Sequence, residues 1–255
     1  MLPLSLIIIT KNEIKHIAAC IEAVKPICAD IVVADSGSSD GTVEAAKACG
    51  ARVYPVEWTG YSDTKNRANQ WAENDWILSL DADEIATPAL LESIKSFMSS
   101  NPSSHTVALI RRRLVYRSRL LYYGSTRHEY RKRLFNRTHA QWNSQAVHED
   151  LNSSSDTYFV KLKGIVEHDS YRDKNDLYEK LERYAQLFAK QKAEEGKRAS
   201  WLKLYVSPYV LFLKNLIIRL GLLDGMPGIE YAMAELYYSK RKYRLIKRYY
   251  ESGAE

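Results

Sequence analysis

Cysteine is scarce in this sequence: there are three in 255 residues, and all three lie among the first fifty. They form no CxxC pair, and no histidine follows at the spacing of a zinc finger. These absences exclude the common zinc-finger and dithiol redox motifs. We expect Cys20, Cys28 and Cys49 to be small buried apolar side chains in a reducing compartment.

Other familiar signatures are also missing. The loop DSGSSDGT lacks the Gly-Lys-Ser/Thr ending of a Walker loop, and it is not a GxGxxG fingerprint. The chain has no internal repeat and no low-complexity tract. The apolar run MLPLSLIIIT has neither a basic leader nor an evident cleavage site. We interpret it as a buried first strand and expect a cytoplasmic protein.

Positive charge is concentrated at one end of the chain. The net charge is +6, and residues 197–255 contain eleven Lys or Arg and five Asp or Glu, so the preceding residues are neutral overall. Such a region suits nucleic acid, an anionic membrane or an acidic substrate. Because it is rich in leucine and tyrosine and has no recognised nucleic-acid module, we expect no nucleic-acid partner.

Apolar runs alternate with helical patterns over the first 100 residues. The predicted strands are 4–9, 30–36, 51–58 and 75–80, the third weakened by Pro55. The predicted helices are 13–24, 42–48, 62–74 and 88–98, with Asn12 and Asp40 as caps of the first two. This alternation predicts an α/β fold whose parallel sheet has helices on both faces.

The rest of the chain has a different pattern. Residues 105–170 contain longer strand candidates of mixed polarity, which indicates an α+β continuation of the same domain around a groove. An amphipathic helix is predicted at 173–195, and a further helix at 227–250.

Segment 201–223 is strongly apolar, but it contains Lys214, Arg219 and Pro208. A charge at the centre of a membrane helix costs on the order of 2.5–3.5 kcal/mol, which opposes a spanning helix. We expect an interfacial helix, assisted by the basic run 240–248, which adds about 1 kcal/mol of attraction to anionic lipid per residue. A buried dimer or core helix pair is the alternative.

Polar side chains follow three of the predicted strands: TKNE, DSGSSDGT and DADE. Ligands of parallel sheets gather at the carboxyl ends of the strands. The three acids Asp81, Asp83 and Glu84 repel one another, and a divalent metal such as Mg²⁺ or Mn²⁺ would neutralise them. The alternative is a set of solvated acids at a helix start. Lys65 and Arg67 are candidates to contact phosphates or, alternatively, solvated surface residues.

The ordered pieces TKNE, VVADSGSSDGT, KNRAN and ILSLDADE are similar to the family 2 inverting glycosyltransferases with the GT-A fold. RLFNR, VHED, GIVEHDSY and GLLDGMPG resemble a subgroup close to the lipopolysaccharide inner-core β-glucosyltransferases. The resemblance spans residues 4 to about 230. It departs at Lys65, which precedes Asn66-Arg67 where many members have a glycine-rich Arg-Asn segment.

The resemblance implies a Rossmann-like nucleotide-sugar-binding sheet flanked by helices. It implies a catalytic domain at 1–170, with a nucleotide-binding half at about 1–100 and an acceptor half at about 101–170. Residues 171–255 would be a helical C-terminal extension that contacts a membrane through 201–250.

The resemblance also implies roles for individual residues. Asp83 would ligate the metal, with His168 as a second ligand, although a structural histidine is the alternative. Asp35 would accept a hydrogen bond from uracil. The residues implied in nucleotide-sugar binding are Thr10, Asn12, Glu13, Asp35, Gly37, Asp40, Lys65, Asp81 and Ala82.

The catalytic base is expected in VHED. We favour Glu149, with Asp150 as second choice and His148 in a supporting role. Arg131 and Arg133 would contact an anionic acceptor or the diphosphate, unless they are ordinary exposed strand residues.

The function implied is metal-dependent, inverting transfer of a hexose, which we expect to be glucose, from a UDP-sugar to a lipopolysaccharide core saccharide. The enzyme would be peripheral on the inner face of the cell membrane. The alternatives are transfer to a capsule or O-antigen lipid-linked intermediate, and a non-catalytic membrane-associated adaptor that binds nucleotide sugars.

Overall fold

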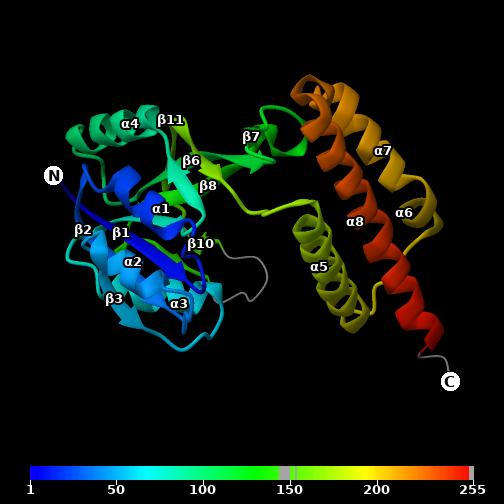
Figure 1. Cartoon of the computed structure of the whole chain (residues 1–255), viewed down its shortest axis with the longest axis horizontal. Coiled ribbons are helices and arrows are strands. Elements are labelled where there is room, and N and C mark those ends of the chain that lie inside the picture. Colours follow the sequence, from blue (N-terminus) through cyan, green and yellow to red (C-terminus); the bar gives the residue numbers. More distant parts are fainter. Residues whose placement is uncertain (144–149, 153, 253–255) are drawn as a thin grey trace. The chain divides into compact units, whose positions relative to one another are not determined.

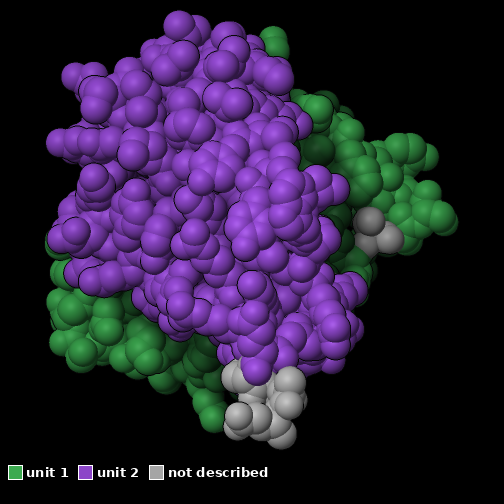
Figure 2. Space-filling model, turned by 90° about the vertical axis from the view of Figure 1, so that its right-hand side faces the viewer, with its two compact units in different colours: residues 1–112, 130–168 green, residues 113–129, 169–255 purple. Residues whose placement is uncertain are grey.

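A computed structural model describes residues 1–143, 150–152 and 154–252. The chain divides into two compact units, which Figure 2 shows in green and purple. Unit 1 contains residues 1–112 and 130–168, and unit 2 contains residues 113–129 and 169–255. Residues 113–129, which the sequence assigns to the acceptor half, therefore group with the C-terminal residues. The division by function stays a prediction.

Four parallel strands form the N-terminal part of unit 1 (Figure 1). Their order in the sheet is β3-β2-β1-β4. They are β1 (Leu2–Thr10), β2 (Cys28–Asp35), β3 (Arg52–Pro55) and β4 (Trp76–Asp81). Each overlaps a strand that the sequence predicts, and helices connect successive strands. The predicted α/β fold is confirmed.

Both faces of these strands are covered by helices. Ile8 of β1 belongs to one apolar cluster, together with α1 (Ile17–Val24) and α4 (Pro88–Ser99). Ile7 belongs to a second cluster, with α3 (Tyr61–Gln70). Successive strand residues point to opposite faces, so a strand covered on both sides needs a continuous apolar run. The three cysteines are free and buried in this unit, as expected.

The first helix begins later than predicted. Helix α1 starts at Ile17 rather than at residue 13, and its cap position is His16 rather than Asn12. Asn12 has a φ of 57°, and its side-chain oxygen accepts a hydrogen bond of 2.9 Å from the backbone N–H of Ser39. Asparagine tolerates the left-handed region better than most residues. Asn12 therefore shapes a loop, whereas α2 (Thr42–Ala48) agrees with its predicted range.

Later strands extend the same sheet in antiparallel orientation. Strand β8 (Tyr130–Asn136) pairs with β4, and β11 (Tyr158–His168) pairs with β5 (Glu84–Ala86). Strand β6 (Thr106–Tyr116) lies between β8 and β11, and a small hairpin consists of β9 (Gln141–Trp142) and β10 (Leu151–Asn152). The pairing of β11 with β5 places His168 opposite Glu84. The strands predicted in the middle of the chain are thus present.

Unit 2 is mainly helical. Helix α5 (Lys174–Glu194) is capped by Asp173, which accepts a hydrogen bond of 2.9 Å from the backbone N–H of Asp176. Helix α8 (Gly225–Ser252) packs along α5. The Arg241 guanidinium on α8 donates to Glu182 on α5 at 2.7 Å, and this hydrogen bond is the main cause that lowers the pKa of Glu182 to about 2.

The segment predicted as an interfacial helix is a series of short helical turns. They are α6 (Trp201–Tyr205), α7 (Ser207–Leu213), η2 (Lys214–Ile218) and η3 (Gly221–Asp224). Pro208 lies in the first turn of α7, where a missing N–H leaves no hydrogen bond unmade. In the described part of the chain, no helix has both the length and the apolar character needed to cross a membrane. Unit 2 also contains β7 (Arg119–Leu120) and η1 (Gly124–His128).

Candidate active site

The carboxyl ends of three parallel strands meet at one edge of the sheet. Thr10 at the end of β1 lies opposite Asp35 of β2, and Ile9 lies opposite Asp81 of β4. The hydroxyls of Thr10 and Ser36 at this edge are buried, with no hydrogen-bond partner among the described residues. Unsatisfied buried hydroxyls are uncommon in folded proteins. The polar residues that follow separate strands thus gather where α/β sheets bind ligands.

The loop after β2 is organised by Asp35. Its carboxylate accepts hydrogen bonds from the backbone N–H groups of Gly37 (3.0 Å) and Ser38 (2.9 Å), and from the Ser38 hydroxyl. Gly37 has a φ of 86°, a conformation that glycine adopts without steric cost. The structure therefore shows Asp35 in a loop-shaping role. Its contact with uracil stays a prediction.

Asp40 joins this loop to the segment after β1. One carboxylate oxygen accepts from the backbone N–H (3.1 Å) and hydroxyl (2.5 Å) of Thr42, and the other accepts from the N–H of Ile14 (3.1 Å). The Thr42 hydroxyl is the main cause that lowers the pKa of Asp40. The same hydroxyl accepts from the backbone N–H of Glu13 at 2.8 Å. The two loops therefore form one hydrogen-bonded rim.

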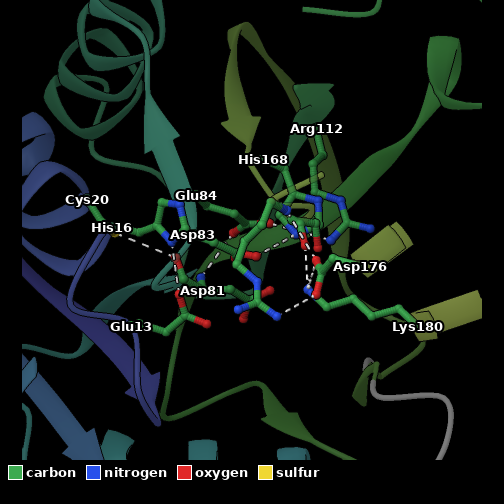
Figure 3. A network of polar contacts seen from close by, with 12 residues as sticks. Glu13, His16, Cys20, Asp81, Asp83, Glu84, Arg112, His168, Asp176 and Lys180 are labelled. Atoms are coloured by element: carbon green, nitrogen blue, oxygen red, sulfur yellow. Dashed lines mark hydrogen bonds and ion pairs between the residues drawn. The ribbon is translucent and has the colours of Figure 1, made fainter. Parts of the chain in front are cut away.

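The acids after β4, shown close together in Figure 3, have cations of the protein as partners. The Lys65 ammonium lies 3.0 Å from one oxygen of Asp81, and the Arg133 guanidinium lies 2.5 Å from the other. Arg133 also lies 2.6 Å from Glu84, which is completely buried. Two of the three acids are thus neutralised within unit 1. The sequence suggests a metal that neutralises all three acids, but Asp81 and Glu84 already have protein cations as partners, which leaves Asp83 as the acid for which a metal stays a prediction.

The charges of this cluster are stabilised by one another. Burial alone would raise the pKa of Asp81, but Arg133 and Lys65 outweigh it and hold that pKa well below its usual range. Burial likewise opposes the charge on Arg133, yet Asp81 and Glu84 raise its pKa above the ordinary value. Asp81 and Arg133 therefore stay charged at neutral pH.

Lys65 and Arg67 have different environments. Lys65 is only 1% exposed, and its ammonium lies 4.7 Å from the ring centre of Trp142. The interpretation of Lys65 as a solvated surface residue is therefore wrong. Arg67 is half-buried, with 43% of its side chain exposed, and forms an ion pair of 3.0 Å with Asp63 on the same helix. Such a surface pair contributes little to stability.

Asp83, the third acid, faces His168 at the end of β11 (Figure 3). Its carboxylate oxygen lies 3.2 Å from the imidazole Nε2, and the two side chains are 19% and 16% exposed. Oxygen and imidazole donors suit Mn²⁺, and such ions often have one or two protein ligands plus water and phosphate oxygens. No cluster of three or more potential ligands occurs within the described ranges. The pair fits an ion whose remaining ligands come from a bound phosphate and water.

Several other predicted residues surround this edge. Ala82 is buried in an apolar cluster, and the Glu13 carboxylate lies 2.9 Å from the His16 ring. Arg131 is exposed on β8. Arg133, expected at an acceptor or a diphosphate, is 3% exposed and is engaged with Asp81 and Glu84. The structure therefore shows Arg133 as an internal counter-ion.

The predicted base lies only partly within the described residues. His148 and Glu149 fall in segment 144–149, which is outside them. Asp150 accepts hydrogen bonds of 2.9 Å from the Lys132 ammonium and from the backbone N–H of Leu151. Strand β9, which precedes this segment, is anchored by Asn66. The Asn66 side-chain amide donates to the Trp142 carbonyl at 2.9 Å and its oxygen accepts from the Trp142 N–H at 3.0 Å.

The chain is similar to known glycosyltransferases over most of its length. The profile described as glycosyl transferase family 2 matches residues 5–152. An uncharacterized glycosyltransferase of Rickettsia prowazekii is 31% identical over 236 residues, covering 89% of this chain and 81% of that protein. A lipopolysaccharide core biosynthesis glycosyltransferase of Rhizobium meliloti, LpsC, is 30% identical over 248 residues, covering 91% of this chain and 89% of that protein.

A solved structure was also matched, glucosyl-3-phosphoglycerate synthase from Mycobacterium tuberculosis in complex with Mn²⁺, UDP and phosphoglyceric acid. The match has a TM-score of 0.36 and 22% identity, and covers 44% of this chain and 43% of that one. Similarity at that level describes neither site nor substrate. The family profile and the two relatives are sufficient by themselves: this chain, with its GT-A fold, belongs to glycosyl transferase family 2.

Proposed function

We propose that this glycosyltransferase is metal-dependent and inverting, and that it moves glucose from a UDP-sugar to a lipopolysaccharide core saccharide. The observation that carries the proposal is the pairing of Asp83 with His168 at the carboxyl edge of the family 2 domain. That edge also holds the hydrogen-bonded rim made by the loops after β1 and β2. An accessible pair of oxygen and nitrogen donors beside such a rim suits the diphosphate of a nucleotide sugar.

Donor binding is assigned to the rim and to the acids beside it. Asp35 accepts a hydrogen bond from the uracil, and Asp81, held in one orientation by Lys65 and Arg133, faces the ribose. Asp83 and His168 hold the divalent ion. When bound, the ion supplies positive charge where the leaving diphosphate becomes more negative.

Inversion requires a general base on the face of the sugar opposite the diphosphate. We assign this role to Glu149, which takes the proton of the acceptor hydroxyl over a heavy-atom distance of about 2.6–3.2 Å. The acceptor oxygen bonds to the anomeric carbon as the bond to the diphosphate breaks, and UDP leaves. Asp150 is the second choice because Lys132 and a backbone N–H already engage its oxygens.

The choice of acceptor is supported by similarity to the Rhizobium meliloti lipopolysaccharide core enzyme over 91% of the chain. Membrane association is supported by the surface of α6 to η3, which exposes many large apolar side chains next to Lys203 and Lys214. Such a surface fits the interface of an anionic bilayer, where a lipid-linked acceptor is held. The exposed residues include Trp201, Leu202, Tyr205, Tyr209, Val210, Leu213, Ile217, Ile218, Leu222 and Leu223.

A transfer assay tests the catalytic part of the proposal. The protein is incubated with UDP-glucose, Mn²⁺ and one of three acceptors: truncated lipopolysaccharide core, a capsule intermediate or an O-antigen lipid-linked intermediate. We expect transfer to the core with inversion, loss of transfer with a chelator, and slow transfer by Glu149→Gln with unchanged UDP-glucose binding. UDP-glucose bound with no transfer to any of the three acceptors would favour the adaptor alternative.

Membrane association is tested with Ile217→Ser combined with Ile218→Ser. Both side chains are more than half exposed, so the change leaves the core intact. We expect weaker sedimentation with vesicles of phosphatidylcholine and phosphatidylglycerol. Equal sedimentation of the variant and the original protein would remove this surface from the membrane contact.

A further inference from the structure

Basic and aromatic side chains line a hollow between α6 and α8 in unit 2. The hollow measures about 220 Å³ and is lined by Leu204, Tyr205, Arg244, Lys247, Arg248 and Glu251. One water takes up about 30 Å³ in the liquid, so the hollow has room for a phosphate group and several waters. With three cations and one acid in its lining, it favours an anion. We call it the α6–α8 hollow.

The spacing of the cations suits a phosphate. Arg244 and Arg248 are four residues apart on α8 and lie on the same face of the helix, with Lys247 beside them. Guanidinium groups donate two parallel hydrogen bonds to phosphate oxygens, and lysine adds a point charge. Lys247 lies 3.3 Å from Glu251, an exposed pair that a bound phosphate can compete with.

The same hollow borders the exposed apolar surface of α6. Tyr205 lines the hollow and is 54% exposed, and its ring centre lies 5.9 Å from that of Trp201, which is 65% exposed. Tryptophan and tyrosine rings favour the headgroup level of a bilayer. A phosphate in the hollow would therefore be flanked by aromatic rings suited to the membrane interface.

We propose that the α6–α8 hollow binds the headgroup phosphate of an anionic phospholipid at a bilayer surface. The inference rests on the proposed membrane association and names the lipid group that the protein recognises. The adjoining aromatic surface favours a lipid over a soluble phosphate ester, because only the lipid places acyl chains next to Trp201 and Tyr205. Nothing in the proposal depends on the sugar-transfer chemistry, so the two can fail separately.

Vesicle sedimentation with the full chain tests the proposal. The vesicles contain phosphatidylcholine and phosphatidylglycerol in a 3:1 ratio, with pure phosphatidylcholine as the uncharged comparison. Arg244→Ala combined with Lys247→Ala should weaken binding about thirtyfold, the effect expected for two basic residues at an anionic surface. The matched control is Arg183→Ala combined with Lys190→Ala, which removes two exposed cations from α5 and should weaken binding less than about threefold.

A conservative variant separates recognition from general attraction. Arg244→Lys retains the charge but loses the paired donors of the guanidinium, so we expect binding about fivefold weaker. Excess inorganic phosphate in solution should not release the protein from the vesicles. Equal losses in the two double variants, full binding by Arg244→Lys, or release by inorganic phosphate would each overturn the hollow as a lipid site. In all three cases the transfer assay would still report on the proposed enzyme.

Discussion

Among the individual residues of the candidate site, Arg133 is the cation that pairs with two acids. It lies 2.6 Å from the buried Glu84 and 2.5 Å from Asp81, and Lys65 completes the charge balance. These contacts leave Asp83 as the acid of the cluster that faces the partly exposed His168. The structure thus separates two acids that are neutralised by Lys65 and Arg133 from the acid that we propose as a metal ligand.

Replacing Arg133 should lower the stability of the protein, because Glu84 and Asp81 would stay buried without their shared cation. Arg133→Met has a similar volume but no charge, so Glu84 loses its closest cation and Asp81 keeps only Lys65. We expect the free energy of unfolding at pH 7 to fall by about 3–5 kcal/mol, the usual cost of removing one member of a buried ion pair. Urea unfolding measures this change in the free energy of unfolding. The control is Arg67→Met, which removes the solvent-accessible ion pair with Asp63 and should lower the free energy of unfolding by less than about 1 kcal/mol.

The loss should also depend on pH. In the original protein the pKa of Asp81 is lowered, so its contribution to stability is present above the unfolded pKa of about 3.9 and disappears only as pH falls below that value. Without Arg133, burial is opposed only by Lys65, and Asp81 takes up a proton more readily in the folded state, so the variant should become relatively more stable as pH falls. The deficit should shrink between pH 7 and pH 5. A deficit that is constant over this range would contradict the assignment.

The burial of both cations could have been predicted from residue spacing. Lys65 shares a helical face with the buried Ala68 and Asn69, three and four residues later. Arg133 lies two residues before the buried Phe135 and shares its strand face. Long basic side chains at buried positions require acidic partners. Which acids they pair with could not be predicted, since the partners depend on how distant strands align.

Among contacts between secondary-structure elements, the packing of β11 against α4 depends on Gly164. Its φ is 85°, and a Cβ there would lie 2.3 Å from the backbone nitrogen of Leu90. Gly50 has a similar φ of 88°, but a Cβ there would meet nothing within 4 Å. These two glycines separate backbone strain from steric overlap.

Gly50→Ala should therefore lower the free energy of unfolding by about 1–2 kcal/mol, from strain alone. Gly164→Ala should lower it by about a further 1–3 kcal/mol, because α4 must shift away from β11. Thermal or urea unfolding of both variants tests this. Equal losses would show that the packing of β11 on α4 tolerates a methyl group.

Asp224 connects the end of η3 to the residues before η1 within unit 2. Its two oxygens accept hydrogen bonds of 2.9 Å from the backbone N–H groups of Tyr122 and Tyr123. Asp224→Ala should cost about 1–3 kcal/mol and speed amide hydrogen exchange at both tyrosines, because both donors lose their acceptor. Exchange within α5 is the internal control. Unchanged exchange at Tyr122 and Tyr123 would contradict this role for Asp224.

Prediction of elements from sequence succeeded where local pattern decides the structure. Continuous apolar runs identified the buried strands β1, β2 and β4, and the stripe of α5 identified that helix. It failed where a polar side chain bonds to a distant segment. Asn12 was expected to cap a helix, but it accepts from Ser39, 27 residues away. A cap and a long-range loop contact use the same residue types, so the sequence alone cannot separate them.

Across the whole molecule, the family match and the excess positive charge lie mainly in different units. Unit 1 contains the residues of the family match except 113–129, and it contains the Asp83–His168 pair. The excess positive charge lies beyond residue 196 in unit 2. This asymmetry of charge was visible in the sequence. The grouping of residues 113–129 with unit 2 was not, because it depends on contacts such as those of Asp224 that no local pattern reports.

Binding of UDP measured by calorimetry, with Mn²⁺ and with a chelator, tests the central claim most directly. For the original protein we predict that Mn²⁺ raises the affinity for UDP at least tenfold, because Asp83 and His168 would hold an ion that offsets the charge of the diphosphate. Asp83→Asn should lose this increase and retain the weak metal-free affinity. If Asp83→Asn binds UDP with the same dependence on Mn²⁺ as the original protein, the metal site is elsewhere and the account is wrong.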